Sequence, residues 1–215
     1  MSLIKILDAI KMDHFGARVK DASDKLVYLH KQQGSLDGAC AVYSTIMDLL
    51  ILGYLKDEDL QIYNPIDSRT SKGKFLQSLF EDRGLVREGF SYTVLTKLLK
   101  DHCPELDVRH RYPSNNSHPH YISQMIDDKL PVIISVTYSD NNITNGHALV
   151  CIGYECDTED RISKLLCLDP GYEVSKVSAW NCFIEIPKSG YKCYLCGIGG
   201  GYECELGDLI VVQKK

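Results

Sequence analysis

Three residues that lie far apart in the chain, Cys40, His147 and Asp169, have the side chains of a thiol nucleophile and its proton-transfer partners. A cysteine thiolate attacks a carbonyl carbon, a histidine takes and returns the proton, and a carboxylate holds the imidazole in one tautomer. The oxyanion that forms needs a hydrogen-bond donor, which the amide of Gln33 could supply from just ahead of the cysteine. These residue types indicate nucleophilic attack by a thiolate on a carbonyl carbon.

Cys40 stands where a polar, glycine-flanked turn over residues 31–39 runs into a strongly apolar segment over residues 41–52. Three polar residues interrupt the apolar segment: Ser44, Thr45 and Asp48. Apolar side chains on nearly every side of a helix predict a helix buried in the core, with Asp37 as its N-cap and Gly53 as its stop. Cys40 would then lie in the first turn, where the helix dipole and free N–H groups favour a thiolate.

His147 and Asp169 are predicted to meet through the pairing of two consecutive strands. His147 is the first residue of a predicted strand over residues 147–155, and Asp169 directly follows a strand over residues 163–168. If these strands form a hairpin, the start of the first lies beside the end of the second. The carboxylate would then reach the imidazole at one edge of the sheet.

Three short motifs resemble those of papain-like cysteine peptidases. The region around the cysteine is similar to their nucleophile region: Gln33-Gly-Ser-Leu-Asp-Gly-Ala-Cys40-Ala-Val-Tyr-Ser44. The histidine strand is similar as well: Gly146-His-Ala-Leu-Val-Cys-Ile-Gly-Tyr154. Two further segments look closest to the bacterial C39-like branch, which uses aspartate where papain has asparagine: Leu168-Asp-Pro-Gly171 and Lys129-Leu-Pro-Val-Ile-Ile134.

This resemblance implies a cysteine peptidase with Cys40 as nucleophile, His147 as base and acid, and Asp169 as the residue that orients the imidazole. It implies that the Gln33 side chain and the Cys40 N–H form the oxyanion hole, that no cofactor is needed, and that the substrate is a peptide or protein. Ala41 departs from the glycine or tryptophan common in the family. Gln33 stands one residue further from the cysteine than usual, so either the turn carries an insertion or Gln32 takes part instead.

The predicted fold is α+β: one papain-like domain over residues 1–215, with an N-terminal helical half and a C-terminal, mainly antiparallel sheet. The helical half, about residues 1–130, contains the buried central helix that packs on the sheet of residues 131–215. Its other predicted elements are helices over residues 3–13, 73–82, 91–102 and 120–130 and a short strand over residues 25–30. The second half reads as consecutive strands joined by turns.

Composition narrows the partners and the compartment. The chain of 215 residues has a net charge of −5 and no long basic run, which gives no support to nucleic-acid or membrane-surface binding. Nine irregularly spaced cysteines and a start without a signal-peptide pattern favour the cytoplasm and free thiols, unless the protein is delivered as an effector. The oligomeric state cannot be read from the sequence.

Other functions are compatible with the same residues. An acyltransferase or transglutaminase-like enzyme can use the same Cys-His-Asp order, and a papain-like fold can also persist as an inactive binding module. Cys193 and Cys196, with Cys204 and the histidines at 118 and 120, could begin a zinc site, although a structural site usually has paired knuckles. The glycine-rich residues 197–203 lack a phosphate-loop ending and predict a hairpin turn.

Overall fold

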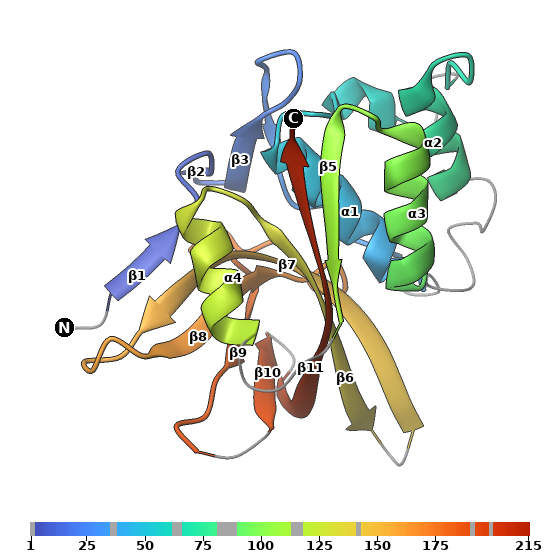
Figure 1. Cartoon of the computed structure of the whole chain (residues 1–215). Helices are drawn as coiled ribbons and strands as arrows, with labels where there is room; N and C mark the ends of the chain where they lie inside the picture. Colours follow the sequence, from blue (N-terminus) through green and yellow to red (C-terminus); the bar gives the residue numbers. More distant parts are fainter. Residues whose placement is uncertain are drawn as a thin grey trace.

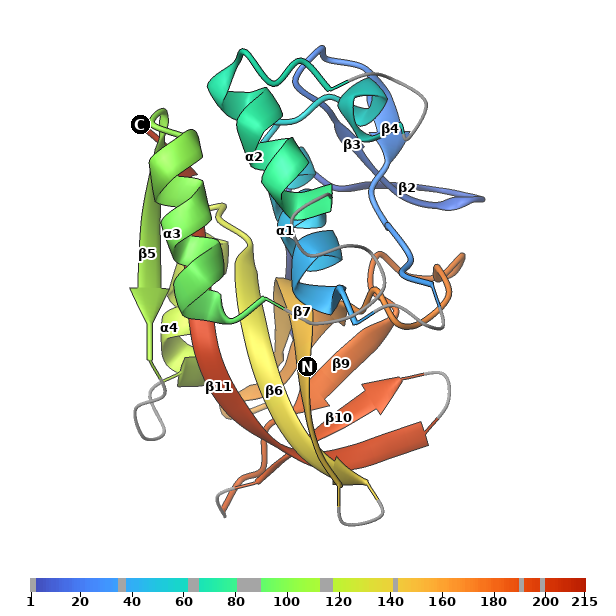
Figure 2. The same cartoon turned by 90° about the vertical axis from the view of Figure 1, so that its right-hand side faces the viewer.

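The structure is a computed structural model of the chain. It describes residues 3–34, 38–61, 66–80, 90–112, 118–140, 143–189, 192–197 and 200–215. Within these residues the dominant element is an antiparallel β-barrel. Most of the helices and a small second sheet gather at one end of it, while the last helix lies against its side (Figures 1 and 2).

Six C-terminal strands close the barrel: β6 (Val132–Asp140), β7 (Ile143–Cys156), β8 (Ile162–Leu168), β9 (Cys182–Glu185), β10 (Cys193–Gly197) and β11 (Gly200–Lys214). Their order around the barrel is β7-β6-β11-β10-β9-β8, and β8 pairs with β7 again, which leaves no free edge in the ring. A register shift between Leu206 and Leu209 marks a bulge in β11 opposite β6. Such bulges bend a strand, as barrel closure requires.

Two further strands extend the barrel strands. β1 (Leu3–Ile6) pairs with the last four residues of β7, and β5 (Leu106–Arg111) pairs with the end of β11. Gly153 allows β1 to approach, because a Cβ at this position would stand 2.4 Å from the Lys5 carbonyl oxygen. A separate three-stranded antiparallel sheet is formed by β2 (Lys11–Asp13), β3 (Gly16–Lys20) and β4 (Leu26–Tyr28).

The described residues form four α-helices: α1 (Cys40–Ile51), α2 (Ser71–Phe80), α3 (Tyr92–His102) and α4 (His118–Asp127). A short 3-10 helix, η1 (Asp57–Leu60), follows α1. The predicted buried helix after Cys40 is confirmed, since ten of the twelve residues of α1 are buried. α1 lies against β7, β6 and β3, while α2 and α3 pack on each other and α4 covers β6, β7 and β8.

The predicted papain-like α+β fold with a helical half is wrong. Of the eleven strands found in the described residues, five precede residue 130, and the six later strands form a closed barrel instead of an open sheet. The helix expected over residues 3–13 is replaced by β1, a turn and β2. The apolar pattern there was too short to distinguish a helix from a strand. Pairing of β1 with β7 and of β2 with β3 gives the backbone N–H and C=O groups partners in extended conformation.

Candidate active site

Cys40 is the first residue of α1, which places its N–H at the helix N-terminus, where it has no partner within the helix. The N-cap is Ala39, and no side chain caps the helix; the expected cap Asp37 lies outside the described residues. The Cys40 side chain is partly exposed, and its sulfur lies 4.0 Å from the Gly38 carbonyl oxygen. One turn later, the Ser44 hydroxyl donates to the Ala148 carbonyl (3.1 Å), which fixes the start of α1 on β7 beside His147.

His147 and Asp169 are in direct contact, as the hairpin argument predicts. β7 pairs with β8, and the His147 Nε2 lies 2.7 Å from the Asp169 Oδ1. The histidine side chain is 14% exposed and the aspartate side chain 2%. Burial opposes protonation of the ring, but the hydrogen bond to Asp169 and the hydrogen bond and charge of Cys40 outweigh it and raise the pKa of His147 to about 10.

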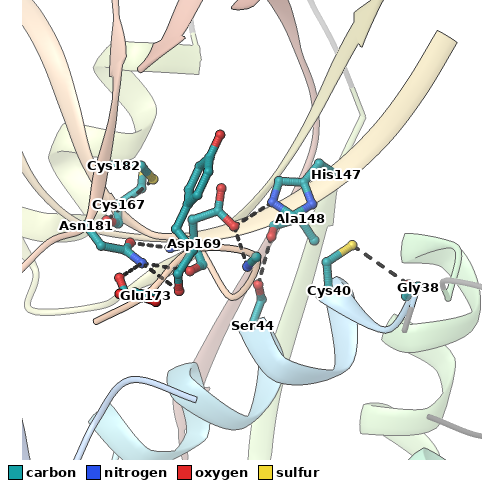
Figure 3. Close-up of polar contacts among 12 residues, drawn as sticks. Gly38, Cys40, Ser44, His147, Ala148, Cys167, Asp169, Glu173, Asn181 and Cys182 are labelled. Atoms are coloured by element: carbon teal, nitrogen blue, oxygen red, sulfur yellow. Dashed lines mark hydrogen bonds and ion pairs between the residues drawn. The ribbon is translucent and has the colours of Figure 1, made fainter. Parts of the chain in front are cut away.

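The imidazole of His147 lies between Asp169 and Cys40 (Figure 3). Because Nε2 is engaged by the carboxylate, Nδ1 is the nitrogen left to exchange a proton with the sulfur. The Asp169 Oδ1 also accepts the N–H of Gly171 (2.7 Å), so the carboxylate is held from two sides. Nucleophile, base and orienting carboxylate therefore stand in the order that covalent thiol catalysis requires.

Gln33 lies beside this group, whereas Gln32 is exposed to solvent. A Cβ at Gly171 would stand 3.8 Å from the Gln33 Nε2 and 3.6 Å from the His147 Cε1, so all three meet around one point. The Gln33 N–H donates to the Pro170 carbonyl (2.9 Å), and its Oε1 is buried without a partner among the described residues. The structure thus brings Gln33 to the site, and not Gln32.

Tyr92, the first residue of α3, is a neighbour of the site that the sequence did not single out. Its hydroxyl is buried and finds no hydrogen-bond partner within the described part of the chain. Burial, followed by the charges of Cys40 and Asp208, raises the pKa of this phenol. In both views the first turns of α1 and α3 are the ends of these helices that lie nearer the barrel (Figures 1 and 2). No motif marks Tyr92, since only the tertiary structure brings α3 beside Cys40.

Replacing Tyr92 by phenylalanine is expected to leave the free energy of unfolding unchanged or to raise it, because a buried hydroxyl without a partner costs about 1–3 kcal/mol. Tyr154→Phe is the matched control, since its hydroxyl donates to Asp127 at 2.9 Å and its loss should cost about 1 kcal/mol. Urea denaturation of both variants measures the difference. Equal destabilisation by the two substitutions would mean that the Tyr92 hydroxyl has a partner.

The cysteines considered for zinc do not form a set of three or more ligands in the described residues. Cys193 and Cys204 face each other across β10 and β11, while Cys196 lies opposite Gly201 and Phe183. No group of three histidine, cysteine or acidic side chains suited to a metal ion occurs in the described ranges. All nine cysteines are free thiols, and only Cys40 and Cys196 are more than slightly exposed.

No model of a known protein family matches the chain, and a comparison with curated proteins finds no match either. Across the residues that the structure describes, none of the helices has the length and apolar character needed to cross a membrane.

Proposed function

We propose that this protein is a thiol hydrolase that cleaves a peptide or amide bond through Cys40, His147 and Asp169. The observation that carries the proposal is the 2.7 Å contact from His147 to Asp169 on one side of an imidazole whose other side faces Cys40. The motif resemblance to C39-like peptidases supports it for the reacting residues alone, because the helical half of that fold is missing. An intact contact also speaks against a site kept only for binding.

The reaction would proceed in two stages. The Cys40 sulfur, its proton held by the His147 Nδ1, attacks the carbonyl carbon; the oxyanion accepts hydrogen bonds from the Cys40 N–H and the Gln33 amide. The carbon–nitrogen bond then breaks, His147 gives its proton to the leaving amine, and a thioester remains on Cys40. Water, deprotonated by His147, hydrolyses the thioester and restores the thiol. Asp169 keeps Nε2 protonated throughout, so that Nδ1 stays directed at the sulfur.

Selective alkylation tests this proposal without knowledge of the substrate. Iodoacetamide at pH 6 should modify Cys40 about 100-fold faster than Cys196, the other partly exposed thiol, because an ordinary thiol is about 0.3% ionised at that pH. Peptide mapping by mass spectrometry gives both rates in one sample. Equal rates at the two cysteines would remove the nucleophile and with it the proposal.

Turnover itself is measured by incubating the protein with a library of proteome-derived peptides and identifying new termini. Cys40→Ala should abolish every cleavage while leaving the unfolding transition unchanged, since the side chain is small and partly exposed. Cleavage that persists in this variant would assign the activity to another group or to a contaminant.

We further propose that the protein works in a reducing compartment, the cytoplasm, on peptide or protein substrates. Nine free thiols support this setting, because oxidising compartments favour disulfides.

A further inference from the structure

The segment between β8 and β9 carries Asp169 at its start and Asn181 at its end, and these two residues are bonded to each other twice. The Asp169 N–H donates to the Asn181 Oδ1 (2.7 Å), and the Asn181 Nδ2 donates to the Asp169 carbonyl (2.8 Å). Nδ2 also lies 3.1 Å from the Glu173 carbonyl. One amide side chain therefore brackets the peptide groups of Asp169 and closes the intervening segment (Figure 3).

Asn181 is itself held rigidly. It is 7% exposed, and its own N–H donates to the Cys167 carbonyl of β8 (3.2 Å). Its acceptor and both donors can all be engaged by this arrangement, which is the full capacity of an amide side chain. A buried polar group with its bonds complete fixes the geometry of its partners.

His30, two residues after β4, reaches the same carbonyl from the other side. Its Nε2 lies 2.9 Å from the Asp169 carbonyl oxygen and 3.0 Å from the Asn181 Nδ2, so the ring donates to that carbonyl in one tautomer and accepts from that amide in the other. Burial lowers the pKa of His30, against the opposing influence of Asp169, which favours a neutral ring. In either tautomer His30 Nε2 bonds to the pair that Asn181 Nδ2 forms with the Asp169 carbonyl.

The N-terminal part of the chain contacts this segment at two further points, one from Gln33 and one from β3. The Gln33 N–H donates to the Pro170 carbonyl (2.9 Å), next to the catalytic carboxylate. Gly16 in β3 has φ +127°, and a Cβ there would stand 2.9 Å from Val174 and 3.2 Å from the Ser175 carbonyl oxygen. Only glycine tolerates both that backbone angle and that close approach.

We propose that Asn181 and His30 are positioning residues that hold the Asp169 peptide so that its Oδ1 faces His147. The N-terminal three-stranded sheet then supports the site, because His30, two residues after β4, is one of the two positioning residues. The catalytic meaning of this inference rests on the proposed function. Its test measures only the pKa of the His147 ring, in protein without substrate.

The measurement is the NMR titration of the His147 ring in isotope-labelled protein, assigned by comparison with His147→Gln. The titratable groups facing this ring are Asp169 and Cys40. Asn181→Leu and His30→Leu should each move the pKa of His147 from about 10 toward its ordinary value, by one unit or more for Asn181. His30→Gln, whose Nε2 can donate from the same place, should restore the parental titration. Tyr154→Phe, a substitution on β7 away from this segment, should leave the titration unchanged.

An unchanged His147 titration in folded His30→Leu or Asn181→Leu protein would overturn the positioning role. If Asn181→Leu does not fold, the comparison of His30→Leu with His30→Gln tests the positioning role by itself. Failure of the proposed function looks different: Cys40 would then alkylate no faster than Cys196 in the parent protein, whatever the titration of these variants shows. If both proposals hold, kcat/KM for a cleaved library peptide is lower in the two leucine variants, and its pH profile changes on the alkaline side. His30→Gln should restore the parental kcat/KM and pH profile.

Discussion

Replacing His147 by glutamine is expected to slow alkylation of Cys40 at pH 6 about 100-fold and to remove all peptide cleavage. The imidazole faces the sulfur and stays protonated up to a pKa of about 10, so its positive charge can stabilise negative charge on the attacking sulfur. A neutral amide cannot do so, and Cys40 would then react as an ordinary thiol. Iodoacetamide rates between pH 5 and pH 9 give the comparison directly.

The control for this prediction is Cys196 in the same samples, whose rate should be the same in parent and variant. Stability supplies a second readout. Because the folded pKa of His147 is raised, its protonation stabilises the parent fully below pH 6.5, and this contribution is lost as the pH rises toward 10. His147→Gln should lack that decline. A variant whose Cys40 still reacts quickly at pH 6 would show that the helix N-terminus, and not His147, activates the thiol.

The contacts of the candidate site were largely accessible from the sequence because each depends on local structure. A run of apolar residues after Cys40 is enough to predict α1, and a single turn between β7 and β8 is enough to bring His147 to Asp169. The resemblance added the order of the residues and the glutamine. Gln33 could be distinguished from Gln32 only in the structure, because residues 31–39 have no periodic pattern.

The fold was not accessible in the same way. Barrel closure depends on pairings such as β6 with β11, between strands separated by about sixty residues, and local alternation does not encode which strands become neighbours. β1 is an example, since Leu3 and Ile4 are exposed and its extended form follows from pairing with the distant end of β7. The helix expected over residues 3–13 was predicted from an apolar rhythm, but this segment contains β1 and β2, which are extended because they pair with β7 and β3.

The residues that support the site were missed for a related reason. His30, Asn181 and Tyr92 are single polar or aromatic residues without a motif around them, and their importance appears only when partners distant in sequence are seen. Asn181 precedes an apolar strand, where a polar side chain is unremarkable. Its role follows from a count of donors and acceptors around Asp169, which no one-dimensional pattern contains.

Asp48→Asn is expected to raise the free energy of unfolding at pH 7, because burial keeps the parent carboxyl protonated at pH values where the unfolded chain has released that proton. Asp48 lies in the middle of α1 with 0% exposure, and both carboxylate oxygens lack partners among the described residues. Burial raises its pKa well above the usual value. The folded protein must therefore keep a proton that the unfolded chain releases above about pH 4, and each further pH unit costs about 1.4 kcal/mol.

The pH dependence separates this cause from a packing effect. The advantage of Asp48→Asn should be absent below pH 4 and grow until the folded carboxyl itself ionises, whereas relief of strain would be the same at every pH. Asp21→Asn is the matched control with the opposite sign. The carboxylate of Asp21 accepts from the Ser23 N–H (2.8 Å) and hydroxyl (2.7 Å) and from the Asp57 N–H (3.0 Å), and these bonds outweigh burial and lower its pKa to about 2. Its replacement should lower stability at pH 7, with the deficit vanishing as the pH falls from about 4 toward 2. If chemical denaturation between pH 3 and pH 8 gave parallel curves for Asp48→Asn and the parent, Asp48 would have to be ionised and compensated in the folded protein.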